Sequence, residues 1–176
     1  MLFRSIEAHF GDGSHMGLDI RYLHETTRLG TGGALSLLPE TPSGPIVVSN
    51  GDVLSKEDYG AVLDAHLAAD AQATVLVRDY EIQVPFGVVS AGPDGVTALQ
   101  EKPTQRFLIN AGVYVLAPEA LALVPRDTFF DLPTLLERML EVGMKVRTHR
   151  AEAYWMDIGR LPDFERANAE FSAVFG

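Results

Sequence analysis

Cysteine is absent from the sequence and basic residues are scarce: 14 Lys and Arg stand against 24 Asp and Glu, a formal charge of −10 at pH 7. The lack of cysteine excludes disulfides, thiolate metal sites and cysteine nucleophiles. The acidic balance argues against a nucleic-acid-binding protein, because phosphate contacts along nucleic acid need clustered Lys and Arg. One small phosphorylated ligand, held by a single Lys or a metal ion, remains compatible with it.

Long apolar runs are also missing. No stretch approaches the ~20 residues that span a bilayer, and the N-terminal residues lack the apolar region of a signal peptide. We therefore expect a cytoplasmic protein with no membrane partner. The 176 residues, 47% of them hydrophobic and interrupted by no linker or repeat, predict one globular domain over residues 1–176.

Short β-branched runs alternate with helical patterns, which predicts a layered α/β fold with an antiparallel insertion in the middle. The predicted strands are residues 46–49, 73–78, 87–90, 96–101, 109–116, 146–149 and 155–157, and the predicted helices are residues 54–70, 132–142 and 161–175. We expect residues 46–49 to form a buried parallel strand and Asp131 to be the N-cap of the second helix. Ligands bind at the carboxyl ends of such strands, which directs attention to the loops after Ser49 and Met156.

Two aspartates lie in these loops. Asp52 follows Asn50 and Gly51, and Asp157 precedes a turn at Gly159. A carboxylate at a strand end suits Mg²⁺, which takes one or two carboxylates together with substrate phosphates. The simpler alternatives are that Asp52 is the N-cap of the next helix and that Asp157 is a turn residue. The hypothesis to test is that both converge on one ion.

Other polar residues interrupt strand-like segments. Glu101 and Lys102 place an anion and a cation at a strand end, where Lys102 either binds a phosphate or forms a solvated surface pair. Asn110 breaks an apolar stretch, so its amide needs a partner, either backbone or the hydroxyls of a sugar.

The Gly-rich segment at residues 29–34 allows a backbone to approach a ligand closely, with a simple turn as the alternative. It lacks the Gly-Lys-Ser/Thr of a P-loop. The five histidines show no metal-ligand spacing, and we expect them to be surface or packing residues: His9, His15, His24, His66 and His149.

The order of these segments resembles that of the sugar-1-phosphate nucleotidyltransferases, the pyrophosphorylases that make nucleotide sugars. The resemblance covers nearly the whole chain and rests on residues 10–13, 20–25, 29–31, 50–52, 86–89, 101–103, 110–114 and 155–159. Residues 78–87 and 130–133 further resemble the bacterial guanylyltransferase-like branch that is often fused to CBS domains. That branch is linked to glucosamine-1-phosphate and legionaminic acid synthesis.

The resemblance implies a Rossmann-like nucleotidyltransferase sheet with helices on both faces. It implies transfer of a nucleotidyl group from an NTP, with GTP as the expected donor, to a sugar 1-phosphate, releasing pyrophosphate. It assigns Mg²⁺ to Asp52 and Asp157 and the sugar phosphate to Lys102. The remaining substrate contacts are assigned to Gly30, Thr31, Gly87, Glu101, Asn110 and Gly112.

One departure from the family is large. The family begins with a strand, a Gly-Gly-x-Gly-Thr-Arg loop and a downstream Pro-Lys that wrap the triphosphate, and this sequence has none of them. We therefore expect a partial domain, lacking the first strand–loop–helix, with an exposed apolar sheet edge. Such a chain is expected to bind NTP weakly and turn over slowly, unless a second copy in a homo-oligomer covers the edge.

Two alternatives of other kinds remain. The first is a non-catalytic module that keeps only the half-site for a sugar phosphate. The second is a metal-dependent glycosyltransferase that uses a nucleotide sugar. Such enzymes usually have two neighbouring acids, whereas Asp52 is followed by Val53.

Overall fold

The computed structural model describes residues 2–176, with side chains from residue 5 onward. Its strands are β1 (Ile46–Ser49), β2 (Val53–Ser55), β3 (Ala73–Gln83), β4 (Val88–Gly92), β5 (Gly95–Gln100), β6 (Thr104–Leu116), β7 (Val146–Arg150) and β8 (Trp155–Asp157). Its α-helices are α1 (Leu2–Phe10), α2 (Gly30–Gly33), α3 (Tyr59–Ala68), α4 (Leu132–Glu141) and α5 (Leu161–Phe175). Shorter 3₁₀ turns are η1 (Ser14–Met16), η2 (Ala34–Leu37) and η3 (Pro118–Leu123).

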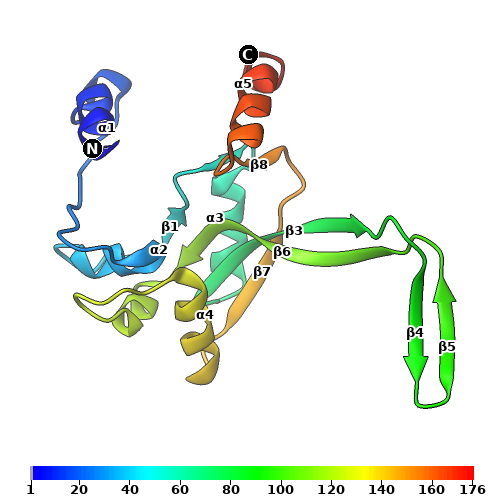
Figure 1. Cartoon of the computed structure of the whole chain (residues 1–176). Coiled ribbons are helices and arrows are strands. Elements are labelled where there is room, and N and C mark those ends of the chain that lie inside the picture. Colours follow the sequence, from blue (N-terminus) through cyan, green and yellow to red (C-terminus); the bar gives the residue numbers. More distant parts are fainter. Residues whose placement is uncertain (1) are drawn as a thin grey trace.

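The central sheet has the strand order β1-β6-β3-β7 (Figure 1). β6 pairs antiparallel with both β1 and β3, whereas β7 runs parallel to β3. The prediction that residues 46–49 form a strand is therefore confirmed, whereas the prediction that this strand is buried and parallel is wrong. β1 is antiparallel and lies at one edge of the sheet, and Val47 is 41% exposed there. Its apolar composition gave no sign of which neighbour it has.

Side chains alternate along β3 and β6, which gives the sheet two apolar faces. On one face Val75 packs in a cluster with Leu135 of α4. On the other, Leu76 and Val113 pack with Val62 of α3. Helices thus cover both faces of the sheet, and the predicted α/β class with its small antiparallel insertion is confirmed.

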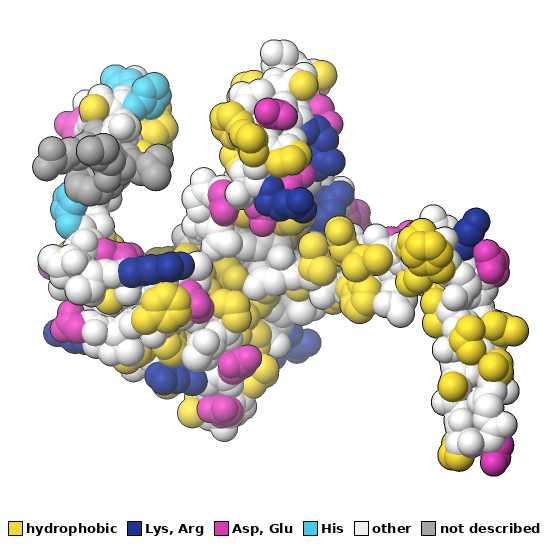
Figure 2. Space-filling view, viewed as in Figure 1, with side chains coloured by type: hydrophobic (Ala, Val, Ile, Leu, Met, Phe, Trp, Pro, Cys, Tyr) yellow, Lys and Arg dark blue, Asp and Glu magenta, His cyan; other side chains and the backbone are white. Residues whose placement is uncertain are grey.

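The outer parts of β3 and β6 leave the sheet and carry the β4–β5 hairpin away from it (Figure 1). We call residues 79–108 the arm. Along β3, residues 73–77 are buried and residues 79–83 are exposed. Exposed hydrophobic side chains gather along the arm (Figure 2): Tyr80, Ile82, Phe86, Val89, Val96, Leu99, Phe107 and Leu108.

The first predicted helix begins later than residue 54. Leu54 and Ser55 belong to β2, which pairs antiparallel with β8. α3 begins at Tyr59, and Asp58 is its N-cap, accepting hydrogen bonds from Gly60 N at 2.9 Å and Ala61 N at 3.1 Å. The predictions for α4 and α5 agree with the structure to within one residue. Within residues 2–176 no helix combines the length and apolar character needed to cross a membrane.

Candidate active site

Asp52 and Asp157 lie beside each other at the end of the β2–β8 ladder. Val53 pairs with Asp157, and Ile158 N donates a hydrogen bond to Asp52 O at 2.8 Å. A Cβ atom built on Gly159 would lie 3.1 Å from Asp52 Oδ2 and 3.0 Å from Asp157 Oδ1. The structure therefore brings the two carboxylates to one small space, which the missing side chain of Gly159 leaves open.

Local hydrogen bonds settle the simpler alternatives for both aspartates. Because Asp58 caps α3, the alternative that Asp52 caps that helix is wrong. Asp157 does stabilise a turn, since its Oδ1 accepts a hydrogen bond from Gly159 N at 2.8 Å. Within the described residues no hydrogen bond reaches the side-chain oxygens of Asp52, which stay available to another ligand.

The Gly-rich segment is fixed by residues 100 positions later in the chain. Thr31 N and Thr31 Oγ1 donate to Asp131 Oδ1 at 2.9 and 3.1 Å, and Leu132 N donates to Thr31 Oγ1 at 3.0 Å. Asp131 occupies the predicted N-cap position of α4, but its side chain makes no capping hydrogen bond. The hydroxyl of Thr31 caps the helix instead, so this threonine ties the Gly-rich segment to α4.

Asn110 finds its partners within the protein. Its Oδ1 accepts from Gly112 N at 2.9 Å, and its Nδ2 donates to the hydroxyl of Tyr114 at 2.7 Å. Burial raises the pKa of Tyr114, although the hydrogen bond with Asn110 acts in the opposite direction. Gly112 has a φ of +74°, and a Cβ there would lie 2.9 Å from Asn50 Nδ2, so only glycine fits this approach.

Two clefts open beside Thr31 and Asn50, which line both of them. The first cleft has a volume of about 460 Å³, and its lining includes Arg28, Asn110, Gly112, Phe129, Trp155 and Asp157. The second cleft has a volume of about 550 Å³, and its lining includes Glu25, Gly30, Ser49, Gly51 and Asp52. Each cleft thus has one aspartate of the pair in its lining, and the two linings share Thr31 and Asn50.

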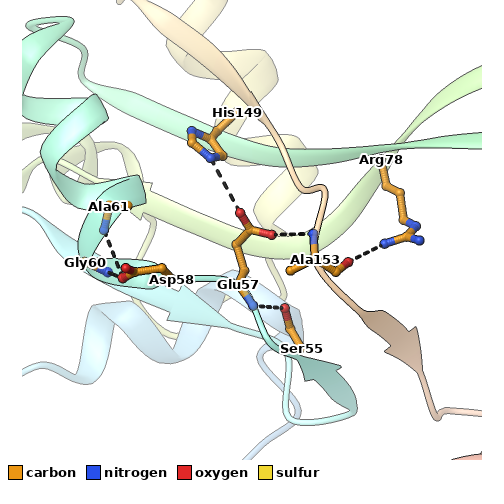
Figure 3. A network of polar contacts seen from close by, with 8 residues as sticks. All are labelled: Ser55, Glu57, Asp58, Gly60, Ala61, Arg78, His149 and Ala153. Atoms are coloured by element: carbon orange, nitrogen blue, oxygen red, sulfur yellow. Dashed lines mark hydrogen bonds and ion pairs between the residues drawn. The ribbon is translucent and has the colours of Figure 1, made fainter. Parts of the chain in front are cut away.

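Polar contacts hold the strand that carries Asp157 (Figure 3). Glu57 Oε2 accepts from Ala153 N at 3.2 Å, and its other oxygen lies 3.8 Å from His149 Nε2. Arg78 Nη1 donates to Ala153 O at 2.8 Å. Further along, Trp155 Nε1 donates to Ala111 O at 2.8 Å. The contacts of Ala153 hold the segment that leads into β8, and the Trp155 hydrogen bond fixes β8 itself against β6.

Three of the predicted site residues lie elsewhere. Gly87, Glu101 and Lys102 belong to the arm and line neither cleft. Gly87 and Glu101 are neighbours there, since a Cβ on Gly87 would lie 3.1 Å from Glu101 Oε2. Lys102 has a φ of +44°, in the left-handed region. The structure therefore groups these residues with one another but not with the aspartates.

The structure also reveals site residues that sequence reasoning missed. Arg28 and Phe129 line the first cleft, and the Arg28 guanidinium carbon lies 5.7 Å from the centre of the Phe129 ring. The one available signal for Arg28 was its place directly before the Gly-rich segment. For Gly159 the sequence indicates only a turn, because the contact of Gly159 with Asp52 depends on the pairing of two strands that are far apart in the sequence.

One of the histidines is a buried core residue. His66 is 2% exposed and its Nδ1 lies 2.9 Å from Thr74 Oγ1, inside the core. Across the part of the chain that the structure describes, no three His, Asp or Glu side chains are grouped so as to hold a metal ion. A cation bound by Asp52 and Asp157 would need further ligands from water or substrate.

Residues 2–173 match the family model described as nucleotidyl transferase. The chain therefore belongs to the nucleotidyl transferase family, and the resemblance found in the sequence is confirmed. Members of this family generally use divalent metal ions. The fold agrees with this assignment: HddC from Yersinia pseudotuberculosis superimposes with a TM-score of 0.64 over 95% of this chain and 73% of that chain, at 22% identity.

Two curated relatives of the chain are named for the reactions that they catalyse. The mannose-1-phosphate guanylyltransferase of Mycobacterium tuberculosis is 35% identical over 173 residues, which cover 93% of this chain and 47% of that protein. The UTP–glucose-1-phosphate uridylyltransferase of Synechocystis sp. is 28% identical over 186 residues, covering 94% and 48%. The chain spans about half the length of these curated relatives. The narrower CBS-associated guanylyltransferase-like branch stays a prediction.

Proposed function

We propose that the chain takes part in transferring a nucleotidyl group from an NTP, with GTP as the expected donor, to a sugar 1-phosphate. The products are a nucleotide sugar and pyrophosphate. The observation that carries this proposal is the carboxylate pair: Asp157 lines the first cleft, Asp52 lines the second, and the two clefts share Thr31 and Asn50 as wall residues. A reaction that joins two separately bound anions needs positive charge at such a boundary. The names of the relatives support the same chemistry.

The residues at this boundary fit a Mg²⁺ ion. Mg²⁺ usually binds proteins through one or two carboxylates and completes its shell with water and substrate phosphates. Asp52 and Asp157 offer two carboxylates around one space, and no third His, Asp or Glu side chain among the described residues joins them to hold an ion. Bound between Asp52 and Asp157, such an ion would supply positive charge to offset the negative charge that develops on the phosphates during transfer.

The protein's own groups then position the reactants. In the first cleft, Asn110 is proposed to bind a sugar hydroxyl through the second N–H of its Nδ2, which the hydrogen bond to Tyr114 leaves unused. Gly112 is proposed to lie against the sugar, with Trp155 at the wall. In the second cleft, the backbone of Gly30 and Thr31 is proposed to line the nucleotide. An oxygen of the sugar phosphate attacks the α-phosphorus in line, and the bond to the bridging oxygen of the leaving pyrophosphate breaks. The attacking oxygen is already ionised, so the step needs no general base.

The arm residues have a place in this proposal only if the arm moves. Binding of the sugar phosphate by Lys102, and of the sugar by Glu101 and Gly87, requires the arm to approach the first cleft. A cytoplasmic location, a homo-oligomer and the absence of nucleic-acid and membrane partners stay predictions from the sequence.

Pyrophosphate release tests the proposal. The chain is incubated with Mg²⁺, GTP or UTP, and mannose, glucose or glucosamine 1-phosphate. We expect a low rate that requires both substrates and falls to background in Asp52→Asn and Asp157→Asn. The matched control is Asp64→Asn, an exposed carboxylate on α3. A rate equal in the wild type and both site variants would refute catalysis, and sugar-phosphate binding indifferent to NTP would favour the non-catalytic alternative.

A further inference from the structure

Arg28 is an unpaired cation in the first cleft. It lines the cleft beside Thr31 and Phe129, and its side chain enters none of the ion pairs or hydrogen bonds found within the described residues. Its guanidinium carbon lies 5.7 Å from the centre of the Phe129 ring. An aromatic ring at this distance attracts the guanidinium and restricts its orientation. Arg28 is an exposed side chain at the cleft, and its N–H groups are therefore free to donate to a ligand there.

The charges around Arg28 make it the group that an anion would meet. Arg28 supplies positive charge to the lining, and Asp131 and Asp157 supply negative charge. Asp131 Oδ1 already accepts two hydrogen bonds from Thr31, and Asp157 Oδ1 accepts one from Gly159. These hydrogen bonds already satisfy part of the acceptor capacity of the two carboxylates, so neither of them needs Arg28 as a partner. Because the protein has a formal charge of −10, it has few other groups that would attract an anionic ligand.

We propose that Arg28 binds a phosphate group of the ligand in the first cleft. A guanidinium presents paired N–H donors that match the oxygens of a phosphate, and none of the Arg28 donors is used in a hydrogen bond within the described residues. The proposal rests on the proposed function, which supplies phosphorylated ligands to this cleft. It differs from the assignment of the phosphate to Lys102, because Arg28 lines the cleft without any movement of the arm.

Calorimetric titration of the chain tests the proposal, with mannose 1-phosphate, unphosphorylated mannose, and GTP with Mg²⁺ as probes. We expect Arg28→Gln to weaken binding of mannose 1-phosphate by about ten- to a hundredfold, as for loss of charge-assisted hydrogen bonds. Binding of mannose should not change. Arg28→Lys should recover part of the loss, because it restores the charge without the paired donors. Arg147→Gln, an exposed arginine on β7, is the matched control.

The outcomes separate the alternatives. A loss of affinity for GTP alone would show that Arg28 binds a phosphate of the nucleotide and not that of the sugar. The proposal is overturned if Arg28→Gln binds both phosphorylated probes as tightly as the wild type does. It is also overturned if the wild type binds mannose 1-phosphate no more tightly than mannose and does not bind GTP. A loss in Lys102→Gln alone would return the phosphate to the arm. Pyrophosphate release is measured separately, so failure of the proposed function is recognised independently.

Discussion

The inner and outer ends of the β3–β6 ladder are continuous strands with very different surroundings. At the inner end, helices cover both faces, and residues 73–77 and 111–116 are buried. At the outer end the same two strands are exposed and continue into the β4–β5 hairpin. The first cleft, which has Asp157 in its lining, adjoins the inner end through Ala111 and Gly112 of β6, whereas Lys102 belongs to the outer end. The comparison shows that packed elements of the core hold the two candidate metal ligands in place. The proposed phosphate role of Lys102, by contrast, depends on where the arm lies.

The largest difference between the two ends should appear in stability. Leu135→Ala removes a fully buried side chain from the cluster under the inner end and should lower the free energy of unfolding by about 2–5 kcal/mol. Leu99→Ala makes the same change on the arm, where the side chain is 73% exposed, and should cost under about 0.5 kcal/mol. Urea unfolding measures both. Equal losses would show that the arm is packed in solution.

A smaller change tests the space between the carboxylates. The Cβ added by Gly159→Ala would lie 3.0–3.1 Å from oxygens of both aspartates, so at least one carboxylate must shift by a few tenths of an ångström. We expect the pyrophosphate-release rate to fall about tenfold with the unfolding midpoint nearly unchanged. Gly44→Ala, where a Cβ meets no atom within 4 Å, is the control. An unaffected rate in Gly159→Ala would mean that the carboxylate positions do not matter.

The smallest expected effect concerns pH. Burial lowers the pKa of His66, partly opposed by Glu119, so near pH 6 the folded state binds fewer protons than the unfolded state. Stability should therefore be unaffected well above the ordinary histidine pKa of about 6.5 and should fall as the pH drops below it. The comparison is the urea midpoint at pH 7.5 and 5.5 in the wild type and in His66→Gln. A drop of equal size in the variant would assign the pH dependence to other groups.

Local patterns predicted the elements whose causes are local. The α4 and α5 boundaries follow from helical spacing and breakers, and both agree with the structure. The predicted start of α3 does not agree with the structure, because residues 53–55 pair with residues 155–157 and form a strand. Three residues carry no periodicity that could distinguish such a strand from a first helical turn.

The site shows the same limit. Asp52 and Asp157 were found because Asp52 lies just after a predicted strand, because Asp157 lies at the end of another, and because the order of the motifs resembles that of a family. The roles of Thr31, Asp131, Gly159 and Arg28 arise from contacts between segments far apart in the chain, such as the hydrogen bonds between Thr31 and Asp131. Sequence order likewise grouped Lys102 with the aspartates, but it carries no information on the direction of a projecting arm.

Binding of Mn²⁺, a paramagnetic substitute for Mg²⁺, tests most directly whether Asp52 and Asp157 share one cation. Titration of the chain followed by water-proton relaxation should show one bound ion per chain. Asp52→Asn and Asp157→Asn should each weaken that binding by at least about tenfold, and Asp64→Asn should leave it unchanged. Undiminished Mn²⁺ binding in both site variants, or a loss in only one of them, would contradict a shared site.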